Sequence, residues 1–285
     1  MSKNGTNHKI TMIGAGNMAR ALIGGLIARH HPADHLAAAD PDAKMRQDVA
    51  QAYGIRTFEA NDRAVSGADV VVLAVKPQVI DEACRSIASA LSEDCVVVSV
   101  AAGTPVARLR SRLGHDRAVV RVMPNTPALH GAGATGLYAA SSCTEAQRDA
   151  ARAIFEAVGE VFEIQDEALM DVVTAVSGSG PAYFFALAEA LAEAGHSAGL
   201  DRATAEGLAA RTAAGAGTML TSGGTSAAEL RRRVTSPGGT TAAALNVLNH
   251  RQFADTVNKA VDAAVQRGKE LAGVPDPNNE SEGKS

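Results

Sequence analysis

The sequence is poor in aromatic residues and in excess charge, and these shortages exclude several classes of protein. It has no Trp, and Phe and Tyr supply only 3% of its 285 residues. The stacking platforms that bind single-stranded nucleic acids are therefore not expected. A formal net charge of −4 gives no basic footprint for nucleic acid or an anionic membrane. No apolar run reaches the roughly 18 residues of a membrane span. We expect neither nucleic acid nor a membrane among its partners.

Cysteine and histidine are also too sparsely placed to build a stapled or metal-bound fold. The three cysteines, Cys84, Cys95 and Cys143, are odd in number and form no CxxC pair, so neither a disulfide framework nor a zinc site is expected. The eight histidines lack HExxH spacing and acidic partners at ligand spacing. The N-terminal residues contain no apolar segment of the secretory kind. We expect a cytoplasmic protein without a metal.

The first part of the chain alternates apolar runs with amphipathic segments. The runs that read as buried strands are residues 9–13, 36–39, 69–75, 95–100 and 118–122. Alternation of strands with helical segments predicts βαβ units and a parallel sheet, with ligands at the carboxyl ends of the strands. We therefore expect a doubly wound, mostly parallel α/β Rossmann domain over residues 1–165.

The second part changes to alanine, leucine and glutamate at helical spacing. Helices are expected near residues 167–176, 181–195, 202–222 and 252–271, which predicts an all-α domain over 166–273 and a polar tail over 274–285. Gly180 before Pro181 predicts a turn that opens a helix. Because this half is short and apolar for its length, we expect a dimer that shares helices.

The segment Gly14–Ala19 has the chemistry of a dinucleotide-binding loop. It reads GAGNMA, follows an apolar strand and opens a helical segment. Gly14 allows the tight turn, Gly16 lets a pyrophosphate approach the backbone, and Ala19 permits close packing of helix on strand. The free N–H groups of a helix start favour the anion. The alternative is a glycine turn needed only for packing.

Asp40, at the end of the second apolar run, bears on the choice between NADH and NADPH. A carboxylate there accepts hydrogen bonds from ribose hydroxyls and repels a 2′-phosphate. The nearest following cations are Lys44 and Arg46. This favours NADH, but an Asp before Pro41 also serves well as a helix N-cap. The sequence leaves both interpretations open.

Five motifs occur in an order that resembles the pyrroline-5-carboxylate reductase family. They are IGAGNMA at 13–19, AVKP at 74–77, RVMPNTPA at 121–128, SGSGPAYFF at 177–185 and RRRVTSPGGTT at 231–241. The resemblance implies a Rossmann domain followed by a helical dimerisation and substrate domain, in homodimers that assemble further into rings. It implies hydride transfer from NADPH or NADH to (S)-1-pyrroline-5-carboxylate, which forms L-proline in the last step of proline biosynthesis.

The resemblance also implies a set of cofactor contacts along the strand ends. By position these are Gly14, Ala15, Gly16, Asn17, Met18, Asp40, Asn61, Ala74, Val75, Lys76, Pro77, Ala102 and Asn125. Two of them have plainer interpretations. Lys76 is equally a solvated charge at a strand end, and Asn125 beside proline commonly caps a turn.

The substrate site is implied to lie in the glycine-rich joint before the last helices. Ser236, Gly239 and Thr240 would hold the substrate carboxylate, and the hydroxyl of Thr241, the catalytic candidate, would face the ring nitrogen. Glu167 would reach the site from the dimer partner. Without the resemblance, this joint reads as a helix N-cap with flexible glycines.

Two stretches depart from the family pattern, and two other functions are considered against the sequence. Gly223–Ser226 replaces an acidic residue and a proline seen in many members, and Arg233 either contacts a cofactor phosphate or belongs to a solvated helix face. A β-hydroxyacid dehydrogenase would need a catalytic lysine on an interdomain helix, and the two glycine joints are foreign to that class. Lys259 and Lys269 are the only lysines of the helical half before the tail, and neither lies next to a glycine joint. A non-catalytic dinucleotide sensor would have no need of the joint at 236–241.

Overall fold

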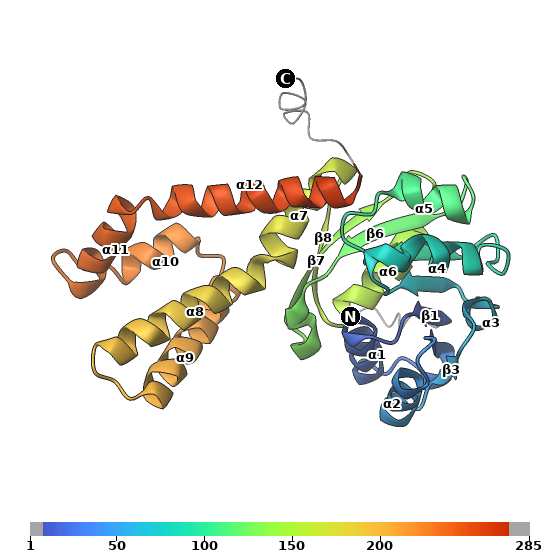
Figure 1. Ribbon diagram of the computed structural model, residues 1–285, viewed down its shortest axis with the longest axis horizontal. Coiled ribbons are helices and arrows are strands. Elements are labelled where there is room, and N and C mark those ends of the chain that lie inside the picture. The colour runs from blue at the N-terminus through green and yellow to red at the C-terminus, as the bar shows by residue number, and fades with distance from the viewer. Residues whose placement is uncertain (1–7, 274–285) are drawn as a thin grey trace, which may run out of the picture. The chain divides into compact units, whose positions relative to one another are not determined.

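The computed structural model describes residues 8–273 and divides into two compact units (Figure 1). One unit is Met1–Gly178 with Ala264–Ser285, and the other is Ser179–Ala263. The domain boundary predicted between residues 165 and 166 stays a prediction, and the predicted tail at 274–285 lies outside the described residues. Along the described chain, no helix is both long and apolar enough to cross a membrane.

The first unit is built on one sheet, whose described strands run in the order β3-β2-β1-β4-β5-β6-β7-β8. Neighbouring strands are parallel except β6 and β7, which are antiparallel. The strands are β1 (Ile10–Ile13), β2 (Leu36–Ala39), β3 (Arg56–Phe58), β4 (Val70–Leu73), β5 (Val96–Ser99), β6 (Val119–Met123), β7 (Gly133–Ala139) and β8 (Gly159–Glu163). The α/β class with a mostly parallel sheet is confirmed.

Helices cover both faces of this sheet because successive strand residues point to opposite sides. In β4, Val70 and Val72 join one core cluster, and Val71 and Leu73 join the other. The first cluster takes residues of α1 (Asn17–Ala28), α2 (Ala43–Tyr53) and α6 (Glu145–Glu156). The second takes residues of α3 (Asn61–Val65), α4 (Ile80–Ile87) and α5 (Val106–Leu113). Burial on both faces explains why the central strands are continuous apolar runs.

The chain reverses its direction across the sheet at β1, which pairs with β2 on one side and β4 on the other. Ligands of doubly wound sheets bind outside the carboxyl ends of strands at such a switch point. The Gly14 N–H donates to the Ala39 carbonyl at 2.7 Å, and the Ala74 N–H donates to the Ile13 carbonyl at 2.8 Å. The loops after β1, β2 and β4 are therefore tied together at this edge.

The joint around residue 180 is helical rather than a turn. The 3₁₀ turn η4 (Glu167–Leu169) leads into α7 (Met170–Val173), the π-helix η5 (Thr174–Gly178) and then α8, which begins at Gly180. Ser179 between them keeps right-handed helical angles of φ −84° and ψ −23°. The predicted helix start at Pro181 is confirmed, because α8 begins at Gly180 and Pro181 lies in its first turn, where its missing N–H costs nothing. The chain enters this helix through Ser179 in helical conformation rather than through a tight turn.

The second unit is helical and carries much apolar surface. It contains α8 (Gly180–Ser197), α9 (Arg202–Thr221), α10 (Ala227–Arg233), α11 (Thr240–His250) and the first part of α12 (Phe253–Leu271). Helices α8 and α9 lie side by side (Figure 1). Their contact is made by small residues, with Ala192, Ala205 and Ala209 buried, while large side chains such as Phe185 remain exposed.

Candidate functional site

The loop between β1 and α1 has the geometry that a pyrophosphate needs. Gly14 has φ +97°, and a Cβ there would lie 2.6 Å from the Ala74 carbonyl oxygen, so only glycine fits. Gly16 is the N-cap of α1 and gives its first turn no side-chain cap. A Cβ on Gly16 would meet nothing within 4 Å, so the backbone is open to approach. An uncapped helix start with open approach fits the phosphate groups of a dinucleotide. Asn17 is exposed, Met18 is half-buried and Ala19 is buried.

Asp40 follows β2 and holds this loop from the side. Its Oδ2 accepts a hydrogen bond from the Ala15 N–H at 2.9 Å, and its Oδ1 accepts one from the Asp42 N–H at 2.9 Å. Helix α2 is capped by Asp42, whose carboxylate accepts from the N–H groups of Lys44 and Met45. The interpretation of Asp40 as the N-cap of α2 is therefore wrong.

The loop after β4 lies directly against the dinucleotide loop. Besides its carbonyl contact at Gly14, Ala74 is followed by Val75, whose side chain would lie 3.1 Å from a Cβ at Gly14. Pro77 opens the 3₁₀ turn η2 (Pro77–Val79). Lys76 is exposed and forms no ion pair with another described residue. Both interpretations of Lys76 therefore stay open, a cofactor contact or a solvated charge.

Two further expected contacts lie at the starts of the next segments. Asn61 begins α3, and its Nδ2 donates to the Ser86 Oγ at 2.9 Å. Ala102 is half-buried in the loop after β5. The neighbouring Gly103 has φ +64°, and a Cβ there would lie 3.0 Å from the Leu271 Cβ, so this loop is packed against the end of α12.

Asn125 ties three segments together after β6. Its Nδ2 donates to the Ser177 carbonyl at 3.2 Å and to the Ser177 Oγ at 3.4 Å, and its Oδ1 accepts from the Ala134 N–H at 2.9 Å. It precedes the 3₁₀ helix η3 (Thr126–His130) but makes no side-chain cap there. The alternative interpretation of Asn125 as a turn cap is therefore wrong, and its contact with the cofactor stays a prediction. The amide instead fixes the end of β6 to β7 and to η5.

A buried ion cluster beside this loop was not predicted as a unit. The Arg121 side chain is only 5% exposed; its Nη2 lies 3.1 Å from the Asp171 Oδ1, and its Nη1 lies 3.5 Å from the Glu167 Oε1. The same Glu167 oxygen accepts from the Val106 N–H at 2.7 Å, at the start of α5. The sequence signal was an arginine inside the apolar run AVVRV, because a buried cation needs carboxylate partners.

The glycine-rich joint in the second unit forms an uncapped helix start. Gly238 has φ +70°, and the Gly239 N–H donates to the Ser236 carbonyl at 3.1 Å. Gly239 is the N-cap of α11 and supplies no side chain, and the helix begins at Thr240. Ser236 and Thr240 are exposed and Thr241 is half-buried. Free N–H groups at a helix start suit a carboxylate ligand.

Two of the arginines before this joint, Arg232 and Arg233, are paired within their own helix. The Glu229 carboxylate accepts from Arg232 at 2.7 Å and from the Arg233 Nε at 2.9 Å. Both arginine side chains are largely exposed. In the divergent stretch Gly223–Ser226, Ser226 caps α10 by accepting from the Glu229 N–H at 3.3 Å. These contacts favour the solvated helix face over a cofactor contact for Arg233.

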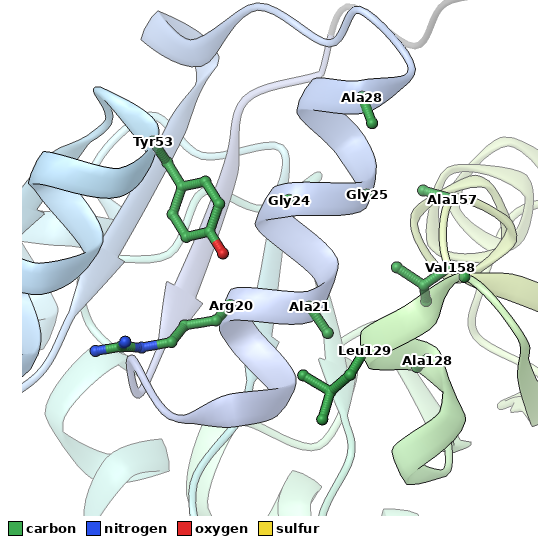
Figure 2. Close-up of a pocket in the computed structure, with 11 residues that line it drawn as sticks. Arg20, Ala21, Gly24, Gly25, Ala28, Tyr53, Ala128, Leu129, Ala157 and Val158 are labelled. Carbon is green, nitrogen blue, oxygen red and sulfur yellow. The ribbon is translucent and has the colours of Figure 1, made fainter.

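A hollow of about 320 Å³ lies beside α1 (Figure 2). The helix presents small residues to it, including Gly24 and Gly25, between Tyr53 on one side and Val158 on the other. A Cβ on Gly25 would lie 2.4 Å from the Val158 side chain. Gly25 therefore serves close packing of α1 against the segment after α6, whereas Gly24 has room for a Cβ at 3.4 Å from the Tyr53 ring.

Comparison with known proteins decides the family. A pyrroline-5-carboxylate reductase of Pseudomonas aeruginosa is 50% identical over 264 residues, covering 93% of this chain and 97% of its own. The chain belongs to the pyrroline-5-carboxylate reductase family. The family model for pyrroline-5-carboxylate reductase dimerisation matches residues 167–271, and the model for NADP oxidoreductase, coenzyme F420-dependent, matches residues 9–103.

Solved structures of the family agree with the fold over nearly its whole length. A pyrroline-5-carboxylate reductase from Coxiella burnetii has a TM-score of 0.90 at 40% identity, covering 94% of this chain and 99% of its own. The Plasmodium falciparum enzyme with NADP bound has a TM-score of 0.82 at 30% identity, covering 93% and 98%. The predicted family and the nicotinamide cofactor are confirmed, and the match to the dimerisation model supports an oligomer.

Among the described residues, neither metal binding nor thiol chemistry is indicated. Within residues 8–273, no group of three or more His, Cys, Asp or Glu side chains could hold a metal ion. Burial raises the pKa of the Cys84 thiol to about 11 and that of Cys95 to about 12. Burial also raises the pKa of Cys143. Thiols held neutral are poor nucleophiles, so the three cysteines serve packing.

Proposed function

We propose that this chain reduces (S)-1-pyrroline-5-carboxylate to L-proline with NADPH or NADH, the last step of proline biosynthesis. The observation that carries the proposal is the 50% identity to the Pseudomonas aeruginosa reductase across 93% of the chain. The loop between β1 and α1 also supports it, because Gly14 forms the tight turn and Gly16 leaves the start of α1 open to a phosphate.

The cofactor is held along the carboxyl ends of β1, β4, β5 and β6. The start of α1, from Gly16 to Met18, takes the pyrophosphate on its N–H groups. Further contacts come from Ala15, Asn61, Ala74, Val75, Lys76, Pro77, Ala102 and Asn125. Because three hydrogen bonds hold the amide of Asn125, its side chain would contact the cofactor in one fixed orientation.

The substrate carboxylate is held by Ser236, Gly239 and Thr240 at the start of α11. The nicotinamide, when bound, supplies a hydride to the imine carbon. A cyclic imine binds already protonated on its nitrogen, so the chain needs no dedicated histidine acid. Its main contribution is positioning, which removes on the order of 7 kcal/mol or more of barrier in the best cases. The Thr241 hydroxyl hydrogen-bonds the ring nitrogen.

In this proposal, only one carboxylate oxygen of Glu167 is left to contact the substrate. Its Oε1 already accepts from the Val106 N–H and faces Arg121. Contact with substrate across a dimer stays a prediction for the other carboxylate oxygen. Assembly into a homodimer, and of dimers into a ring, is likewise part of the proposal, as is a cytoplasmic location.

The decisive assay is oxidation of NADH and NADPH with pyrroline-5-carboxylate as the acceptor, with nucleotide binding measured on the same preparation. We expect turnover that depends on both substrates. A folded protein that binds the nucleotide but shows no rate above background would refute the proposal. Turnover of a β-hydroxyacid instead would identify a dehydrogenase, and nucleotide binding without any turnover would identify a sensor.

A further inference from the structure

The position of Asp40 bears on which nicotinamide cofactor the chain accepts, a question that the family assignment leaves open. Each Asp40 carboxylate oxygen accepts one backbone N–H at 2.9 Å, from Ala15 in the dinucleotide loop and from Asp42 at the entry to α2. These two hydrogen bonds hold the Asp40 carboxylate in one orientation beside the dinucleotide loop. Because a carboxylate has about four lone-pair sites, each oxygen can still accept a further hydrogen bond.

The nearest cation to Asp40 is occupied by the backbone. The Arg46 Nη1 donates to the Asp40 carbonyl and to the Pro41 carbonyl, each at 2.8 Å. Its Nη2 lies 3.7 Å from the Glu59 Oε2, and the side chain is only 20% exposed. Arg46 is therefore committed to bracing the turn after β2.

Two further cations near Asp40, Lys44 and Arg20, are paired as well. The Lys44 Nζ lies 2.8 Å from the Asp48 Oδ2. The Arg20 Nε donates to the Ala15 carbonyl at 3.2 Å, and its Nη2 lies 3.4 Å from the same Asp48 oxygen. These hydrogen bonds hold the pKa of Asp48 below its usual range. A 2′-phosphate would meet a fixed carboxylate and three cations that are already paired. Lys76, after β4, is exposed and forms no ion pair with another described residue, so Asp40 rather than a missing cation carries the argument.

We propose that Asp40 is the residue that makes this chain prefer NADH over NADPH. Its carboxylate accepts from the hydroxyls of the adenosine ribose and repels a 2′-phosphate placed on that ribose. This inference rests on the proposed function, because it concerns the cofactor of that reaction.

The test measures dissociation constants of NADH and NADPH by calorimetry in the absence of the imine. We expect the unmodified chain to bind NADH about tenfold or more tightly than NADPH, because one repulsive charge pair at short range is worth at least that factor. Equal binding, or tighter binding of NADPH, would overturn the proposal. Since no turnover is involved, failure of the proposed reaction would leave this ratio intact, so the two failures are distinguishable.

Asp40→Asn is the main variant, with Asp42→Asn as its matched control. Asn keeps one acceptor for the backbone but loses the charge, so we expect the NADH-to-NADPH affinity ratio to fall by about tenfold or more, chiefly through tighter NADPH binding. Asp42→Asn removes the same charge two residues away and keeps a good N-cap, so its ratio stays near the unmodified value. An unchanged ratio in Asp40→Asn, or the same fall in both variants, would contradict the proposal.

Arg46→Gln tests the competing explanation, in which a cation reads the phosphate. If Arg46 only braces the turn, this variant weakens both nucleotides equally. Selective loss of NADPH binding in Arg46→Gln would show that Arg46 gives up its hydrogen bonds to the backbone carbonyls and binds the 2′-phosphate. That result would overturn the proposal that Asp40 sets the preference for NADH. Should Asp40→Asn fold poorly, Asp40→Ser gives the same comparison, and the ratio of the unmodified chain is itself decisive.

Discussion

At the scale of single residues, Thr241 is the side chain on which the proposed chemistry depends most. It is the second residue of α11 and half-buried, behind the uncapped helix start at Gly239. We predict that Thr241→Ala lowers kcat/KM by roughly 10- to 1000-fold, the value of one strong polar contact made in the transition state. Thr241→Ser keeps the hydroxyl and serves as the control. Steady-state kinetics with the imine decide the matter, and unchanged values in the alanine variant would remove Thr241 from the mechanism.

Arg121 gives a prediction about stability rather than chemistry. Replacing it with Met leaves Glu167 and Asp171 facing each other without their cation, and breaking a buried ion cluster typically costs about 3–5 kcal/mol. The control is Arg152→Ala, which removes an arginine that is 38% exposed and paired with Glu156 and Glu163. Exposed pairs of that kind are worth about 0–1 kcal/mol.

The free energy of unfolding in urea, at fixed protein concentration, distinguishes the two arginine variants. Equal losses for Arg121→Met and Arg152→Ala would show that the cluster is not a stabilising unit. Glu167→Gln adds a finer comparison. The amide keeps an oxygen for the Val106 N–H, so it should cost less than the loss of Arg121.

Sequence reasoning found residues whose roles are local and missed those whose partners are distant. The roles of Gly14 and Gly16 follow from a turn and a helix start within a few residues of chain. The partners of Arg121 lie 46 and 50 residues away, and no spacing rule connects them. The sequence likewise contained no sign that the Asp40 carboxylate accepts a hydrogen bond from Ala15, in a loop 25 residues earlier.

At the scale of elements, the two adjacent glycines of α1 should respond to alanine in opposite ways. In Gly24→Ala the new Cβ meets the Tyr53 ring at 3.4 Å, an ordinary contact. Alanine is favoured over glycine in a helix by about 0.5–1 kcal/mol, so this variant should gain stability. In Gly25→Ala the Cβ would lie 2.8 Å from the Ala157 carbonyl oxygen and closer still to the Val158 side chain.

For Gly25→Ala the clash outweighs the helix preference, because a backbone oxygen cannot rotate away. Overpacking of this kind costs about 1–3 kcal/mol. Unfolding of the two variants in urea measures the difference directly. A gain in both would mean that the segment after α6 yields to the helix, and would contradict the packing described for Figure 2.

The strands that the sequence predicted well are those formed by uninterrupted or nearly uninterrupted apolar residues. The central strands β1, β2, β4, β5 and β6 are buried on both faces, so their sequences are continuous apolar runs. Strand β3 has only three residues, and β7 reads GATGLYA, in which small residues hide the pattern. A Cβ at Gly136 of β7 would lie 2.5 Å from the Val173 side chain, so close packing rather than β-propensity selects glycine there.

At the scale of the whole molecule, the helical unit carries apolar side chains that need a partner. Phe184 and Phe185 on α8 are 62% and 66% exposed, Leu208 on α9 is 56% exposed and Val247 on α11 is 61% exposed. Exposed apolar groups on this scale mark an interaction surface. They fall inside residues 167–271, the part that matches the dimerisation model.

We therefore predict that the chain is a dimer or a larger assembly at micromolar concentration, and that Phe185→Glu dissociates it. Burial of one Phe is worth about 1.5–3 kcal/mol, and a symmetric interface loses this contribution twice. The dissociation constant of the dimer should therefore rise by about 100-fold or more. Leu129→Glu is the control, because Leu129 is 49% exposed but lies outside the dimerisation match. Light scattering after size-exclusion chromatography gives the masses, and a monomeric unmodified chain would contradict the prediction.

The same variant tests whether one chain suffices for the reaction. Every cofactor contact proposed above lies within the first unit of one chain, so Phe185→Glu should bind NADH as tightly as the unmodified protein. If the substrate site also draws on a second chain, as the resemblance implies for Glu167, kcat/KM for the imine should fall in the dissociated variant. That loss should recover as protein concentration rises and dimers re-form. Full activity from a dilute monomer would show that each chain carries a complete site, and would restrict Glu167 to its contacts with Arg121 and Val106.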